Sequence, residues 1–388
     1  MFKEPQQKII ITRRNGKRLT AVWQDQRVVE WIAEEEDPDL AVGDICLAQV
    51  KNVVRNMEAV FLDILPEQPC FMPLEKGAKR PVPGDVFPVV VTREGTALKA
   101  PRVSRSLSLT GRHIVLITDK LQVAVSAKIH SQARRDALTA LLTSLAEKEN
   151  IGFIVRTNAE NASDETILKE AEALIRQLAE IRQTALHRSL FTRLYAAGRA
   201  SESIIRDHPE GIQTEVLTDQ TDIYEELLRL PYFTLDSELS LRLYDDSYPL
   251  DKCYRLDHFL QIALERRVWL KSGGFLIIDY TEALTVIDVN TGKYDGHKNK
   301  EETFFKINQE ACLEIGYQLR LRNLSGIILV DFIDMEKEEH RQQVQRLLRE
   351  TLSKDPQKAV LVDITKLNLA EITRKKVRMP LWMSLKDF

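Results

Sequence analysis

Two apolar strands late in the chain each contain an acidic residue at or near the end, and these carboxylates are well placed to do chemistry. The first, residues 284–290, carries Asp288 and Asn290, and the second, residues 326–334, carries Asp331. Because strand side chains alternate between faces, Asp288 and Asn290 are predicted to point the same way. Two carboxylates and an amide can hold Mg²⁺ and leave room for water and phosphate oxygens. Alternatively, both aspartates only cap the helices or turns that follow their strands, and spacing alone does not decide.

Length and composition indicate several domains. The chain has 388 residues, of which 44% are apolar and 29% charged, and its formal net charge of −3 identifies no partner. It has neither a signal-peptide core nor an apolar run that could span a bilayer, so we expect a cytoplasmic protein without a membrane span. The cysteines are far apart and form no C-x-x-C pair, which predicts reduced core thiols rather than a disulfide frame or a zinc site. They are Cys46, Cys70, Cys253 and Cys312.

Short strands dominate the first hundred residues. Strands are expected over residues 8–12 and 18–23 around an Asn15-Gly16 turn, and again over 27–31. From residue 42 to 105, short strands punctuated by Gly and Pro fit a small five-stranded OB-type barrel. Phe61 and Phe71 lie on adjacent predicted strands and could stack on unpaired bases. The alternative is that both rings belong to the barrel core.

The rest of the chain mixes strands and helices, which favours an α/β layer structure. A capped helix is predicted from residue 163, and helices are expected over 301–322, 336–352 and 369–376, with a strand over 359–364. Arg156 and Thr157 lie on a predicted loop, where a guanidinium and a hydroxyl could clasp a terminal phosphate or form a structural pair. Residues 374–378 form a basic run, which on its own indicates only a solvated face.

Several longer blocks resemble the ribonuclease E/G family, and its ribonuclease G branch most. The blocks are Glu282–Gly292, Gly296–Asn299, Gln318–Leu324, Gly326–Met335 and Glu371–Lys376. Members of this family cut single-stranded RNA endonucleolytically and favour a 5′-monophosphorylated end. The resemblance implies a multidomain α+β and α/β chain in four parts. These are an RNase H-like domain (1–37 and 200–263), an interrupting OB-fold RNA-binding domain (38–105), a 5′-sensor-like domain (106–199) and a DNase I-like catalytic domain (264–388).

The resemblance also implies roles for individual residues. Asp288 and Asp331 match the family's magnesium-binding aspartates, and Asn290 matches the asparagine that orients the first of them. The positions expected to contact RNA are Phe61, Phe71, Lys99, Arg374 and Lys375. Arg156 and Thr157 match the 5′-phosphate pocket.

The sequence also departs from the family pattern. It has no counterpart of the C-P-x-C zinc-link motif or of the small domain that follows it, so we expect neither zinc nor a zinc-linked dimer, and the oligomeric state stays open. The leading hypothesis is a Mg²⁺-dependent endoribonuclease that hydrolyses single-stranded RNA in RNA processing or decay and favours 5′-monophosphorylated RNA. The first alternative is an RNA-binding protein of the same family with reduced or no catalysis. A DNase or small-molecule phosphodiesterase is the third hypothesis.

Overall fold

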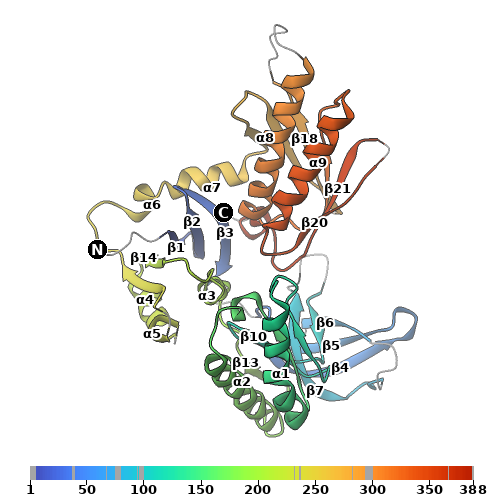
Figure 1. Ribbon diagram of the computed structural model, residues 1–388. Coiled ribbons are helices and arrows are strands. Elements are labelled where there is room, and N and C mark those ends of the chain that lie inside the picture. The colour runs from blue at the N-terminus through green and yellow to red at the C-terminus, as the bar shows by residue number, and fades with distance from the viewer. Residues whose placement is uncertain are drawn as a thin grey trace. The chain divides into compact units, whose positions relative to one another are not determined.

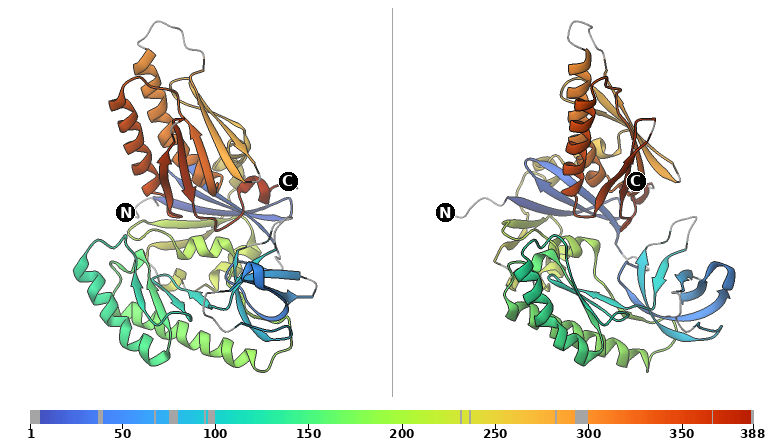
Figure 2. Two further views of the ribbon diagram at one scale, coloured as in Figure 1. Left: turned by 90° about the vertical axis from the view of Figure 1, so that its right-hand side faces the viewer. Right: turned by 45° about the vertical axis from the view of Figure 1, so that its right-hand side comes forward.

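The computed structural model describes most of the chain, and its contacts divide it into two compact units (Figures 1 and 2). The first unit combines residues 1–36 with 213–388, and the second comprises residues 37–212. None of the described helices is both long and apolar enough to cross a membrane. The described residues are 6–36, 40–66, 68–74, 80–93, 95, 100–230, 232–235, 237–281, 283–292, 300–365 and 367–386.

The second unit contains a closed barrel, as the sequence predicts. Its five described strands are β4 (Ile45–Val54), β5 (Ala59–Leu65), β6 (Gln68–Pro73), β7 (Val86–Arg93) and β8 (Arg102–Ser104). They run in the order β4-β5-β6-β8-β7, and a β4–β7 pairing closes the cylinder. Alternate residues such as Val60, Leu62 and Ile64 fill its interior. The architecture is therefore that of an OB-like barrel.

A four-stranded sheet and two long helices make up most of the rest of this unit. The strands, in the order β11-β12-β10-β9, are β9 (Ser108–Thr110), β10 (Ile114–Ile117), β11 (Val123–Val125) and β12 (Gly152–Val155). The helices are α1 (Gln132–Glu149) and α2 (Asp164–Ala185). The Ser163 side chain caps α2 by accepting a hydrogen bond from the Thr166 backbone N–H, which confirms the predicted helix start. Shorter elements are η1 (Arg55–Met57), η2 (Thr157–Ala159), β13 (Arg193–Tyr195) and α3 (Ala200–Arg206).

The first unit begins with a five-stranded mixed sheet in the order β15-β14-β1-β2-β3. Strands β1, β2 and β3 are antiparallel, whereas β14 and β15 run parallel to β1. The β1–β2 turn is Asn15-Gly16, and both residues have a positive φ, as a tight hairpin requires. The strands are β1 (Gln7–Arg14), β2 (Lys17–Gln24), β3 (Arg27–Glu35), β14 (Thr214–Thr218) and β15 (Leu239–Leu243). The accompanying helices are α4 (Thr221–Leu228), α5 (Tyr232–Leu235), α6 (Leu250–Cys253) and α7 (Leu256–Leu264).

The last part of the first unit is a two-layer α/β structure. Helices α8 (Lys300–Leu321) and α9 (Glu338–Ser353) lie on one face of a six-stranded sheet in the order β16-β17-β18-β19-β21-β20 (Figures 1 and 2). Alternate strand residues such as Ile287 and Val330 pack into the core below these helices. The strands are β16 (Arg267–Trp269), β17 (Phe275–Tyr280), β18 (Leu284–Asn290), β19 (Gly326–Asp331), β20 (Ala359–Ile364) and β21 (Leu369–Arg374), and α10 (Leu381–Ser384) follows.

One predicted element is wrong. Residues 369–374 of the expected helix 369–376 form the strand β21, which lies between β19 and β20 and pairs antiparallel with both. Ala370 and Ile372 are buried on the helix-covered face, while Glu371 lies on the other face. This is the period of a strand, and a short apolar run does not by itself separate strand from helix.

The cysteines only partly follow the prediction of core thiols. Cys46, Cys70 and Cys312 are buried, and burial raises the pKa of Cys46 to about 11 and that of Cys70 to about 12, so both stay protonated and unreactive. Cys253 is exposed at the end of α6, which corrects the prediction for this residue. The four-domain division implied by the resemblance is finer than the two units and stays a prediction.

Candidate active site

The predicted carboxylates lie side by side. Strands β18 and β19 are parallel neighbours, and their register places Asp288 directly beside Asp331. Adjacent strands are about 4.8 Å apart, so the two backbones hold the carboxylates within reach of one ion. Both side chains are exposed, whereas Ile287 and Val330, one residue before each, are buried. The aspartates therefore project from the face opposite α8 and α9.

Asn290 takes part in the same site. Its Nδ2 donates a 2.8 Å hydrogen bond to Oδ2 of Asp288, two residues earlier on the same face of β18. This bond leaves Oδ1 of Asp288 without a partner among the described residues. Asp331 likewise accepts no hydrogen bond from the part of the chain that the structure describes. The amide thus fixes one carboxylate while oxygen atoms of both stay available to a ligand.

The two carboxylates repel each other. The pKa of Asp331 is raised above its ordinary value, first by partial burial and then by the negative charges of Asp288 and Asp334. A bound cation would remove this repulsion. Mg²⁺ is commonly held by one or two carboxylates and keeps several waters, so this donor set fits Mg²⁺. Within the described residues, no group of three or more His, Cys, Asp or Glu side chains lies close enough together to hold a metal, and the predicted absence of zinc stays a prediction.

Two residues that the sequence analysis did not single out position the segment after Asp331. Asn308 of α8 is fully buried, and its amide donates to the Ile333 carbonyl (2.8 Å) and accepts from the Ile333 N–H (3.1 Å). Two turns earlier on α8, Glu301 accepts hydrogen bonds from the N–H groups of Glu336 and Lys337. The sequence did contain a signal for Asn308, because this polar residue occupies a helix position where an apolar residue is expected. Together the two side chains hold the chain that leaves β19 against α8.

Phe61 and Phe71 lie on the outside of the barrel, not in its core. They are register partners on β5 and β6, and their ring centroids are 5.9 Å apart at an interplanar angle of 69°. Both are half-buried and neither belongs to the barrel core. Arg102 of β8 is exposed and pairs in register with Phe71, so a cation that the sequence analysis missed flanks the two rings. Lys99 falls outside the described residues.

Arg156 and Thr157 occupy the start of η2, where β12 ends. The guanidinium of Arg156 donates two parallel hydrogen bonds to Asp207, of 2.7 and 2.8 Å, and a third to the Gly111 carbonyl. Burial raises the pKa of Asp207, but hydrogen bonds from Arg156 and Arg206 outweigh it, so the net pKa is lowered. The hydroxyl of Thr157 lies 3.1 Å from that of Ser126. Asp207 therefore holds Arg156 in place, and any phosphate would meet an oriented guanidinium.

The structure argues against the predicted RNA contact of Arg374. This side chain is 2% exposed and donates to both carboxylate oxygens of Asp355, to the Asn323 side chain (3.1 Å) and to the Leu324 carbonyl (3.0 Å). A guanidinium with these buried partners is part of the protein framework. The neighbouring Lys375 is exposed, as alternation along the chain requires, and remains a candidate contact.

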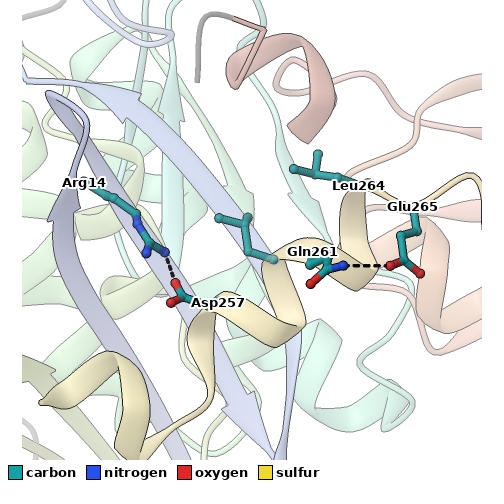
Figure 3. Close-up of a pocket in the computed structure, with 6 residues that line it drawn as sticks. Arg14, Asp257, Gln261, Leu264 and Glu265 are labelled. Atoms are coloured by element: carbon teal, nitrogen blue, oxygen red, sulfur yellow. Dashed lines mark hydrogen bonds and ion pairs between the residues drawn. The ribbon is translucent and has the colours of Figure 1, made fainter.

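A separate cavity of about 420 Å³ lies beside α7, and neither Asp288 nor Asp331 lines it (Figure 3). At one end Arg14 of β1 forms an ion pair with Asp257, and at the other Gln261 donates a hydrogen bond to Glu265. Leu260 and Leu264 also line it. The Arg14–Asp257 pair joins α7 to the N-terminal sheet, and none of the candidate site residues lines the cavity.

Comparison with known proteins shows the family of this chain. The fold and site define a mixed α/β protein with an OB-like barrel and a pair of sheet-borne carboxylates. The model of the Ribonuclease E/G family matches residues 108–377, and the chain belongs to this family. It is 33% identical to a Ribonuclease G of Haemophilus influenzae and 32% identical to that of Escherichia coli, in each case over 87% of this chain and 73% of the relative. A Ribonuclease E of a Nostoc species is 32% identical over 92% of this chain and 54% of its own length.

The contrast between Arg374 and Lys375 gives a first prediction. Arg374→Met leaves the buried Asp355 carboxylate without its partner, and we expect the free energy of unfolding to fall by about 3–5 kcal/mol. Urea unfolding at pH 7 measures this change. Lys375→Met is the matched control and is expected to stay within about 0.5 kcal/mol of the wild type. Equal stability of the two variants would contradict the framework role of Arg374.

Proposed function

We propose that this protein is a Mg²⁺-dependent endoribonuclease that hydrolyses single-stranded RNA in RNA processing or decay. The observation that carries the proposal is the in-register pair Asp288 and Asp331 on the open face of the sheet. Membership of the ribonuclease E/G family and the similarity to ribonucleases G and E support the choice of RNA as substrate.

The chain's own residues supply the framework for hydrolysis. Asp288 and Asp331 would hold the ion through their free oxygens, and Asn290 fixes the rotamer of Asp288. When bound, Mg²⁺ lowers the pKa of a coordinated water and offsets negative charge at the phosphodiester. Asn308 and Glu301 keep the segment after Asp331 in place, so the carboxylate pair is organised before RNA arrives.

The barrel supports a preference for unpaired RNA. Phe61 and Phe71 present partly exposed rings from adjacent strands, on which unpaired bases can stack. Arg102 beside them, together with the predicted contacts Lys99 and Lys375, would neutralise backbone phosphates. Base-paired RNA keeps its bases stacked on one another, so it does not offer them to these rings.

The finer domain architecture is part of the proposal. In the N-terminal sheet, three antiparallel strands are followed by two strands parallel to the first, which supports an RNase H-like domain. The two-layer arrangement around β18 and β19 supports the DNase I-like catalytic domain. The sheet and helices between residues 106 and 199 would form the 5′ sensor.

Replacing the carboxylates tests the catalytic assignment. Asp288→Asn and Asp331→Asn keep the side-chain shape but remove charge, and we expect each to lower kcat at least about 100-fold because metal-assisted charge stabilisation is worth several kcal/mol. Cleavage of a single-stranded A/U-rich oligoribonucleotide is the measurement. EDTA should abolish wild-type cutting and excess MgCl₂ should restore it. The assignment fails if both variants cut at the wild-type rate; RNA binding without any metal-dependent product would instead indicate a non-catalytic RNA-binding protein.

The 5′ end of the substrate tests the roles of Arg156 and Thr157. We expect an oligoribonucleotide with a 5′-monophosphate to be cut faster than the same oligoribonucleotide with a 5′-triphosphate or a 5′-hydroxyl. Thr157→Val removes one donor without disturbing the Arg156–Asp207 pair, so it should reduce this preference and leave the rate on the 5′-hydroxyl form unchanged. Equal wild-type rates on all three ends would remove the sensor and leave the nuclease assignment intact.

A further inference from the structure

The sheet that bears the aspartates has an open face with a second group of side chains. Strands β16, β17 and β18 are antiparallel neighbours, and side chains paired in register share a face. One row across them runs from Trp269 to Phe275 to Asn290. The adjacent row runs from Arg267 through β17 to Asp288. The residues of β16 and β17 in these rows therefore lie on the same face as the carboxylates.

Trp269, Phe275 and Arg267 form one aromatic and cationic cluster, which we name the β16–β17 platform. The rings of Trp269 and Phe275 are 5.3 Å apart between centroids and inclined by 63°. The Arg267 guanidinium lies 4.6 Å from the Phe275 centroid and 5.6 Å from that of Trp269. Trp269 is 63% exposed, so most of the largest apolar side chain of the cluster faces water.

Arg267 keeps its charge available. Within the described residues its guanidinium makes no hydrogen bond or ion pair, and it lies over the rings of Trp269 and Phe275 instead. By contrast, its neighbour Arg266 is paired with Asp279 at 2.7 Å. An unpaired guanidinium above one exposed and one half-buried ring presents a stacking surface and a positive charge together, which is the combination that binds single-stranded nucleic acid.

We propose that the β16–β17 platform stacks an unpaired base of the RNA next to the phosphodiester held at Asp288 and Asp331, with Arg267 on the adjoining phosphate. The inference rests on the proposed function. Trp269 and Asn290 are two strand spacings apart, or about 10 Å, so the platform adjoins the carboxylates. A second copy of the chain or another protein is a less suitable partner for the β16–β17 platform than RNA. The platform is continuous with the carboxylate site, and it carries the unpaired guanidinium of Arg267.

Cleavage kinetics of the full chain with modified RNA test the platform. The substrate is one 5′-monophosphorylated single-stranded oligoribonucleotide with a single cut site, in which each nucleotide near that site is replaced in turn by an abasic residue. Trp269→Ala is expected to raise KM about tenfold on the intact oligoribonucleotide, and Trp269→Phe should restore most of the loss. The effect of Trp269→Ala should vanish on the one abasic substrate that lacks the stacked base. Tyr248→Ala removes a ring of similar exposure outside this sheet and is expected to change nothing.

Other outcomes would overturn the proposal. Wild-type KM in Trp269→Ala, or an equal defect on every abasic substrate, would mean that no base stacks there. A change in oligomeric state of Trp269→Ala in light scattering would assign this face to a second copy of the chain. If the wild type cuts no RNA, the proposed function fails; anisotropy of the labelled oligoribonucleotide in EDTA then still tests the platform, because wild-type affinity in Trp269→Ala would overturn it as well.

Discussion

The parallel pairing of β18 with β19 is the constraint on which the proposed site depends. Its register sets Asp288 beside Asp331. A shift of one residue in either strand would turn its aspartate toward the core and expose Ile287 or Val330. The apolar packing below α8 and α9 therefore enforces the geometry of the polar face. The pKa of Asp331 is raised by burial and by the neighbouring charges of Asp288 and Asp334, and a bound cation would offset this repulsion.

Several motif residues serve this geometry from inside the fold. Arg322 is buried and donates to Gln318, to the Tyr280 hydroxyl (3.0 Å) and to the Ile262 carbonyl (3.0 Å). Arg374 joins the start of β19 to the turn before β20 through Asn323 and Asp355. Buried charges are tolerated only with such partners. Arg322 and Arg374 thus stabilise the fold behind the sheet. The polar residues on the open face of the sheet are the ones available to a ligand.

The sequence predicts those features of the fold and of the site that depend on local pattern. Turn chemistry located Asn15-Gly16, alternation placed Asp288 and Asn290 on one face, and the spacing of short strands indicated the barrel. Local pattern does not show which distant segments of the chain pair with each other. The burial of Arg374 depends on Asp355, nineteen residues earlier, and on β21 entering between two other strands. The platform was missed for the same reason, since Trp269 and Asp288 become neighbours only through the register of three strands.

Direct titration with Mn²⁺, a paramagnetic substitute for Mg²⁺, tests the central claim without relying on catalysis. Electron paramagnetic resonance of free Mn²⁺ at pH 7 would give the number of bound ions and the Kd for the wild type, Asp288→Asn and Asp331→Asn. We predict one site in the wild type that MgCl₂ displaces, with the Kd raised at least about tenfold in each variant because each loses a carboxylate ligand. Wild-type Mn²⁺ affinity in both variants would contradict the claim that this carboxylate pair holds the metal.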